Sequence, residues 1–135
     1  QPTSGVQRLY RSLAFDVYYA PFDADDFLAP GIWDSQAVQN GANVDFDIWT
    51  SDDRGEIQRV VVLYRPVAQA FWSKLELAYD ADTNHATGRA HGLTGAFEYF
   101  VQAVDGTGNV GVWFSAPATV ATSFQQRIHL PIIVR

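Results

Sequence analysis

Acidic side chains have the clearest capacity for chemistry in this chain, and many of them stand in segments with loop-like composition. Oxygen ligands on flexible loops suit Ca²⁺, which takes six to eight of them. If a metal binds, we expect its ligands among Asp23, Asp25, Asp26, Asp52, Asp53 and Asp105. The alternative is that these residues serve turns only, since Asp is a preferred turn residue. The sequence has no EF-hand loop pattern, so calcium is a conditional prediction.

Catalytic chemistry has little support in the residue types and their spacing. The conventional acid–base candidates near neutral pH are His85, His91 and His129. No Gly-x-Ser-x-Gly elbow and no His-Glu-x-x-His motif occurs. The pairs Asp25/Asp26 and Asp52/Asp53 are adjacent in loops, whereas a glycosidase needs two carboxylates about 5 to 9.5 Å apart across a cleft. We therefore predict that the chain is not an enzyme.

Composition narrows the class of protein. The chain has 135 residues, of which 47% are apolar and 14% aromatic, so it can build a packed core. This length fits one domain of about 100 residues with an appendage of roughly 30. A net charge of −6 argues against a nucleic-acid surface, and the lack of cysteine excludes disulfides and thiol chemistry. No apolar run approaches the ~20 residues of a membrane-spanning helix.

The two ends of the chain suggest a larger parent protein. The chain begins Gln-Pro-Thr-Ser-Gly and has no methionine, as expected of a piece cut from something longer. Residues 129–135 form a short apolar tail that resembles the Leu-Pro-aliphatic-Arg ends of secreted proteins from some environmental bacteria. A final edge strand or a frayed tail would explain the same residues. We expect a C-terminal piece of a secreted or surface-attached bacterial protein.

Short alternating runs separated by turn residues predict strands and no long helix. The strand with the clearest alternation contains Val44, Phe46 and Ile48, which should face inward. The next strand, 57–65, should be buried on both faces because it carries a continuous valine run. Residues 85–91 present only small side chains on one face, which indicates an edge strand or a close approach of another backbone. Further strands are expected at 32–38, 71–79, 98–103 and 110–114, with a further one at 12–20.

Residues 93–109 carry the most informative pattern. Leu93 stands six residues before Tyr99, Val101 and Ala103 continue the alternation from Tyr99, and Asp-Gly-Thr-Gly-Asn follows as a turn. This stretch resembles the E–F corner and F strand of fibronectin type III and related immunoglobulin-like modules, and Leu93, Tyr99, Val101 and Ala103 would be its structural residues. The resemblance implies a tyrosine corner, in which the Tyr99 hydroxyl bonds to backbone near residues 93–96.

The fold that this resemblance implies is all-β: an immunoglobulin-like antiparallel β-sandwich over residues 29–122. Residues 1–28 would be an N-terminal extension with an extra strand or the remnant of an upstream domain, and 123–135 a tail or edge strand. Residues 57–65 and 98–114 should be neighbours in one sheet. The loops at one end of such a sandwich would gather the acidic residues named above, together with Glu56 and Asn109.

The function that follows is non-catalytic: a spacer, a domain-docking element or an adhesion module. Its partner would be an upstream domain of the same protein or another surface protein. The alternative is a carbohydrate-binding module that uses exposed aromatic side chains, with Phe100, Trp113 and Trp49 as the candidates. The aromatic N-terminal segment is expected to pack on the sandwich, or on a symmetry-related copy of itself, and to cover Phe100 or Trp113, since an exposed apolar strand would associate.

Overall fold

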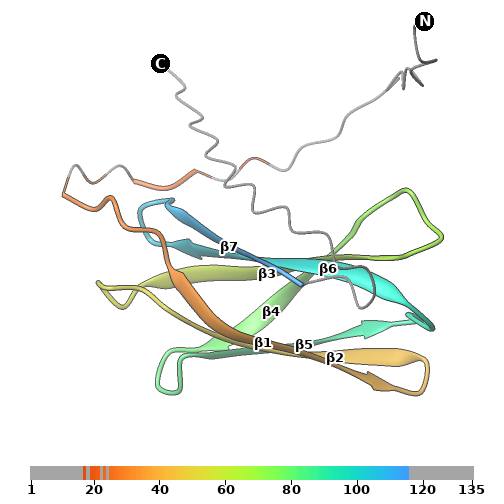
Figure 1. Cartoon of the computed structure of the whole chain (residues 1–135). Coiled ribbons are helices and arrows are strands. Elements are labelled where there is room, and N and C mark those ends of the chain that lie inside the picture. Colours follow the sequence, from red (N-terminus) through yellow and green to blue (C-terminus); the bar gives the residue numbers. More distant parts are fainter. Residues whose placement is uncertain (1–16, 18, 22, 24, 116–135) are drawn as a thin grey trace, which may run out of the picture.

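The described part of the chain is an antiparallel all-β structure of seven strands (Figure 1). The computed structural model describes residues 17, 19–21, 23 and 25–115. The strands are β1 (Gly31–Asn40), β2 (Asn43–Ser51), β3 (Ile57–Pro66), β4 (Ser73–Asp80), β5 (His85–His91), β6 (Phe97–Asp105) and β7 (Val110–Phe114). The prediction of strands without a long helix is confirmed over these residues.

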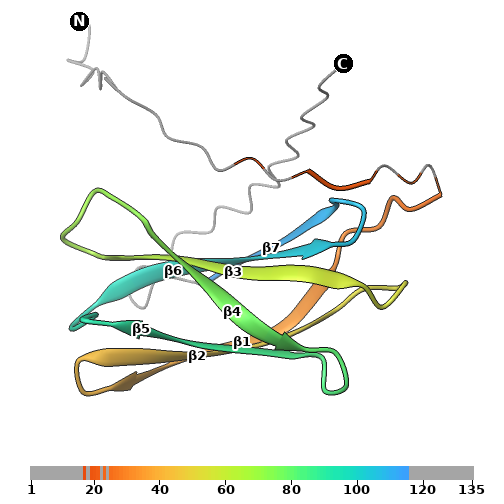
Figure 2. The same cartoon turned by 180° about the vertical axis from the view of Figure 1, so that it is seen from behind.

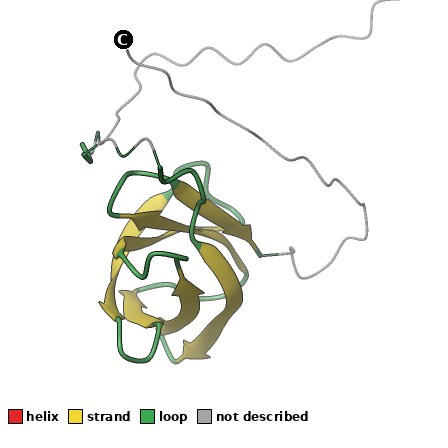
Figure 3. Ribbon diagram, turned by 90° about the vertical axis from the view of Figure 1, so that its left-hand side faces the viewer, coloured by secondary structure: helices red, strands yellow, loops and turns green. Residues whose placement is uncertain are grey.

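Strand order differs from the expected pair of separate sheets. All seven strands form one hydrogen-bonded sheet in the order β1-β2-β5-β4-β3-β6-β7. Strand β4 makes the connection, because Ser73–Leu77 pair with β3 and Ala78–Asp80 pair with β5. It crosses from the layer of β3 and β6 to the layer of β2 and β5 (Figure 2). The sheet therefore curls around its core like a barrel that is nearly closed, and not clearly as a two-sheet sandwich (Figure 3).

Pairing around β3 and β6 agrees with the sequence prediction. Strand β3 pairs with β6 from Ile57 opposite Asp105 to Pro66 opposite Phe97, so residues 57–65 and the 98–114 hairpin are neighbours. Val60, Val61 and Val62 are all buried, which confirms burial on both faces of this strand. A strand whose two faces are both covered has no solvent side, so a continuous valine run suits it.

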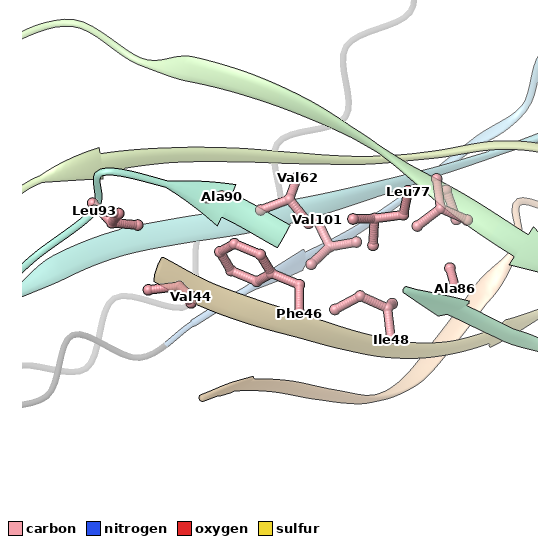
Figure 4. Close-up of a cluster of buried hydrophobic side chains, with 11 residues drawn as sticks. Val44, Phe46, Ile48, Val62, Leu77, Ala86, Ala90, Leu93 and Val101 are labelled. Carbon is pink, nitrogen blue, oxygen red and sulfur yellow. The ribbon is translucent and has the colours of Figure 1, made fainter. Parts of the chain in front are cut away.

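The core is filled by buried side chains of β2, β3, β4, β5 and β6, together with Leu93 (Figure 4). Phe46 is its largest side chain and contacts the rings of Tyr64, Phe97 and Tyr99 at centroid distances of 6.1, 6.3 and 5.3 Å. The other buried members are Val44, Ile48, Val60, Val62, Leu77, Ala86, Ala90, Leu93, Val101 and Ala103. The inward-facing prediction for β2 is confirmed, and Leu93, Val101 and Ala103 are buried as well.

The small residues of 85–91 had indicated an edge strand, but β5 lies between β2 and β4 inside the sheet. It pairs with β2 along its whole length and with β4 at its start. Phe46 lies opposite Gly88 in the register, and a Cβ on Gly88 would come within 2.5 Å of a Leu77 methyl group. Gly88 is small because large side chains from neighbouring strands occupy the space above it. The sequence had left a close approach of another backbone as its alternative, whereas the atoms that approach Gly88 belong to leucine side chains of β4.

The two edges of the sheet approach each other where the chain enters β1. The backbone of Pro30 packs directly on Gly111 of β7, so closely that no Cβ would fit between them. This contact brings the segment before β1 against the β6–β7 hairpin. The predicted strand at 12–20 lies mostly outside the described residues, and Val17, Tyr19 and Ala20 within it are not in a strand. The predicted tail at 123–135 also lies outside them.

Candidate functional site

Three aspartates from distant parts of the sequence meet at one end of the structure. Asp26 precedes β1, Asp52 follows β2, and Asp105 ends β6. One carboxylate oxygen from each lies within 4.8 Å of the others. The three segments that carry them meet at the end where the chain enters β1 (Figure 1). Asp105 is fully buried and Asp26 is only 7% exposed, while Asp52 is half-buried. We call these residues the aspartate cluster.

Asp105 is held by the turn that follows it. Its Oδ1 accepts hydrogen bonds from the amides of Thr107 and Asn109 at 2.9 and 2.8 Å, and its Oδ2 accepts one from Asn109 Nδ2 at 2.8 Å. Gly108, at φ +93°, allows the turn to close. Burial raises the pKa of Asp105, but the hydrogen bonds from Asn109 and Thr107 outweigh it and leave that pKa below its ordinary value. Asp105 therefore stays ionised although it is buried.

Asp26 is attached to this turn from the other side. Thr107 Oγ1 lies 2.8 Å from Asp26 Oδ2 and 3.0 Å from Asp105 Oδ1. A hydroxyl has a single proton, so Thr107 can donate to only one of these carboxylates at a time. Asn109 Nδ2 also donates to the backbone carbonyl of Asp26 at 3.3 Å. The remaining oxygen of the side chain, Asp26 Oδ1, is buried and has no hydrogen-bond partner.

Asp52 completes the aspartate cluster from the β2–β3 loop. Its Oδ2 accepts a hydrogen bond from the Arg54 amide at 2.9 Å, which shapes the loop. Its Oδ1 is buried without a hydrogen-bond partner. Burial raises the pKa of Asp52 above its ordinary value, and the negative charges of Asp53, Asp105 and Asp26 add to the effect. The cluster is therefore a place where carboxylate charge is concentrated and incompletely compensated.

The other predicted ligands do not join this cluster. Asp23 Oδ2 forms an ion pair with Arg54 Nη1 at 3.2 Å, and the Asp25 carbonyl accepts a hydrogen bond from Arg54 Nη2 at 2.5 Å. Asp53 is exposed. Sequence reasoning named all three residues that meet, but it did not identify Thr107, whose hydroxyl lies between two of them. The only local signal for Thr107 was its place inside a turn flanked by Asp105 and Asn109.

A second candidate lies on the outer face of β6 and β7. Phe100 lies between Trp72 and Phe114, with ring centroids 5.1 and 5.6 Å away. Beside them is an open groove of about 330 Å³, also lined by Glu98, Tyr99 and Ser115. We call this the aromatic groove. The Arg65 guanidinium lies 4.6 Å from the Trp72 ring centre and donates hydrogen bonds to Glu98 Oε2 at 3.0 and 2.8 Å. Charged groups thus border the rings.

One member of the expected aromatic set, Trp113, is corrected, and a second, Trp49, has one ring face covered. Trp113 faces inward, where its ring packs 5.6 Å from Tyr99 against the core. Phe114 is the register partner of Phe100 and takes the outward position instead. Trp49 does face outward, but His85 stacks on it at 4.4 Å with an interplanar angle of 13°, which covers one ring face. The alternation of Val110, Val112 and Phe114 on one face was the signal that pointed to Phe114.

Tyr99 does not form the expected tyrosine corner. Its hydroxyl lies 3.3 Å from Ser35 Oγ on β1, and the bond to backbone near 93–96 is not made. The Leu93 carbonyl accepts a hydrogen bond from Gln39 Nε2 at 2.8 Å instead. Burial raises the pKa of Tyr99. The sheet curls so that β1 comes across the core from β6, and this places a hydroxyl partner in front of the phenol.

The described histidines have structural surroundings. His85 Nε2 is 3.1 Å from Asp47 Oδ1, although the geometry is not that of a hydrogen bond. His91 Nδ1 is 3.0 Å from Asn43 Oδ1, at the other end of the same strand. His129 lies outside the described residues.

The chain matches no protein-family model, and no curated protein resembles it at a significant level. Among the described residues there is no helix with the length and apolar character needed to cross a bilayer.

Proposed function

We propose that this chain is a non-catalytic immunoglobulin-like module of the fibronectin type III kind, within a larger secreted or surface-attached protein. Immunoglobulin folds place strands A, B and E in one sheet and C, F and G in the other. The matching partition here is β1, β2 and β5 on one side and β3, β6 and β7 on the other, with β4 joining them. This distribution of strands supports the proposal, and the continuous pairing through β4 is its departure from the standard arrangement.

The aromatic groove carries the functional part of the proposal. Phe114 on β7 is 62% exposed, and Trp72, at the end of the β3–β4 loop, is 41% exposed. Contiguous exposed apolar surface marks sites of interaction with another molecule. The Arg65–Glu98 pair supplies a charged border to the rings, as polar rims do around the apolar centres of protein interfaces. The module would act by docking this face on another protein domain.

Labelling of the rings by hydroxyl radicals tests this role. The isolated chain should label readily at Trp72 and Phe114, and the same residues should be protected in the full-length parent protein. Trp33 on β1 is 55% exposed and takes no part in the groove, so its labelling serves as the control. Equal labelling of the groove in the two proteins would contradict docking on a domain of the same chain.

Carbohydrate binding is the second candidate, and the shape of the groove favours it. Its lining combines the rings with polar atoms of Glu98 and Ser115, the combination that orients a small polar ligand on an apolar surface. The rings are tilted by 73° and 33° relative to Phe100, so they would hold a twisted chain better than a flat crystalline face. A pull-down on insoluble and soluble polysaccharides should then show binding that Trp72→Ala abolishes and Trp33→Ala leaves intact. Equal retention of both variants would remove this candidate.

A further inference from the structure

We propose that Asp26, Asp52 and Asp105 bind one calcium ion between the segment before β1, the β2–β3 loop and the β6–β7 turn. The aspartate cluster by itself would not justify this, because acidic residues are common in turns. Two further observations point to a cation: carboxylate oxygens that are buried without a partner, and the spacing of the donor atoms.

The unpartnered oxygens are the first of these observations. Asp26 Oδ1 and Asp52 Oδ1 are both buried and accept no hydrogen bond, and Asp26 as a whole is only 7% exposed. A buried polar atom without a partner is costly, and the cost is larger for an ionised group. Of the other two oxygens, Asp52 Oδ2 accepts from the Arg54 amide, and Asp26 Oδ2 lies within hydrogen-bond distance of Thr107 Oγ1, which it shares with Asp105. A bound cation would supply the missing partner to both oxygens at once.

The uncompensated negative charge of the aspartate cluster also favours a bound cation. Arg54 follows Asp52 by two residues and could have neutralised the cluster. Its guanidinium is instead directed to Asp23 and to the carbonyl of Asp25. The hydrogen bonds to Asp105 from Thr107 and Asn109 come from uncharged groups, which orient this carboxylate without neutralising it. Three carboxylates at this distance repel one another unless a positive charge joins them.

The donor set and its spacing select the ion. All donors are oxygens, from carboxylates on three loops, which is the ligand type of a hard cation. Calcium–oxygen distances are about 2.3 to 2.6 Å, so two oxygens on opposite sides of one ion are roughly 5 Å apart. One oxygen from each of the three residues lies within 4.8 Å of the other two, which fits a common ion with small adjustments. Calcium tolerates irregular geometry, whereas magnesium requires a nearly ideal octahedron at shorter distances.

The ion would also have a structural consequence. Among the described residues, Thr107 and Asn109 contact Asp26, Arg54 contacts Asp23 and Asp25, and the Gly106 amide donates a hydrogen bond to the Glu56 carbonyl, so direct contacts already link the three segments. A calcium ion would fix the entry into β1 against the β6–β7 hairpin. In a multidomain protein this entry is where a preceding domain would join, so calcium would stiffen that junction.

Calorimetric titration of the whole chain with calcium chloride, after removal of metal with a chelator, tests the site. We expect one ion per chain and a higher melting temperature in calcium, because a ligand that binds only the native state stabilises it. Asp52→Asn should weaken calcium binding at least tenfold, and Asp26→Asn should do the same. Asp53→Asn is the matched control, since it removes an exposed neighbouring charge outside the cluster and should leave the affinity within about twofold.

The metal-free melting temperature separates a binding site from a purely structural cluster. If the carboxylates repel one another without an ion, Asp52→Asn should melt higher than the wild type in chelator and lower than it in calcium. No binding heat and no shift of the wild-type melting temperature at 10-millimolar calcium, or equal affinity in Asp52→Asn and Asp53→Asn, would overturn the proposal. A larger shift with magnesium than with calcium would overturn the choice of ion.

Discussion

An alanine at Gly111 should destabilise the fold more than any other glycine-to-alanine change at a position without positive φ. A Cβ built there would lie 3.0 Å from the Pro30 carbonyl carbon, 3.6 Å from its Cα and closer still to its oxygen. These atoms belong to backbone, so no side-chain rotation can make room. Relief requires that β7 and the entry into β1 move apart, which opens the edge contact of the curled sheet.

The magnitude follows from the cost of overpacking. Added methyl groups in a packed site typically cost 1–3 kcal/mol. We expect the upper end, about 3 kcal/mol, because the obstacle is rigid. For a domain of this size, about 3 kcal/mol corresponds to a fall in melting temperature of roughly 12 to 24 °C. Pro30 is four residues from Asp26, so the same change should also weaken calcium binding.

Urea unfolding followed by tryptophan fluorescence gives the free energies of unfolding. Gly31→Ala is the control, since the nearest atom to a Cβ there is the Ser51 carbonyl oxygen at 3.9 Å and its cost should stay within about 0.5 kcal/mol. If Gly111→Ala were as stable as Gly31→Ala, the close packing of Pro30 on β7 would be refuted, and with it the near closure of the sheet.

Two further predictions concern the core. Phe46→Ala should lower the free energy of unfolding by about 3 to 5 kcal/mol, because Phe46 is 1% exposed and contacts three other rings. Phe71→Ala, at an 85% exposed position, should lower it by less than about 0.5 kcal/mol, and similar losses for the two variants would contradict this core. Tyr99→Phe should cost about 0.5 to 1 kcal/mol through loss of the hydrogen bond to Ser35, with no additional loss when Ser35→Ala is combined with it. Additive losses in that double-mutant cycle would show that the two hydroxyls do not interact.

Strand positions were predictable because their signal is local. Val44, Phe46 and Ile48 alternate with polar residues, and the period of two follows from the backbone geometry of any strand. Because successive side chains of a strand point to opposite faces, the valine run at 60–62 indicated burial on both faces. The error at β5 arose because Ala86, Gly88 and Ala90 bury little by themselves. The small size of Gly88 is explained by Leu77 and Leu75, whose side chains reach it from β4.

The candidate sites were predictable in residue type and only partly in membership. Turn composition identified the acidic loops, and six aspartates were equally plausible on that basis. Asp26, Asp52 and Asp105 meet because the entry into β1 packs on the β6–β7 turn, while Arg54 draws Asp23 away. In the aromatic groove, Phe114 takes the outward position that was expected for Trp113. This depends on the register of the β6–β7 hairpin, because a shift of a single residue moves each side chain to the opposite face of the sheet.

By itself, the sequence determined an antiparallel all-β chain, its strand positions, most of its core and the loops rich in carboxylates. These properties depend on residues that are close in the chain, where alternation and turn chemistry act directly. Only the tertiary structure decided that β4 joins the two halves into one curled sheet, that Tyr99 meets Ser35, and which aspartates and rings come together. Such contacts join residues tens of positions apart, and they depend on register, curvature and packing that no local pattern encodes.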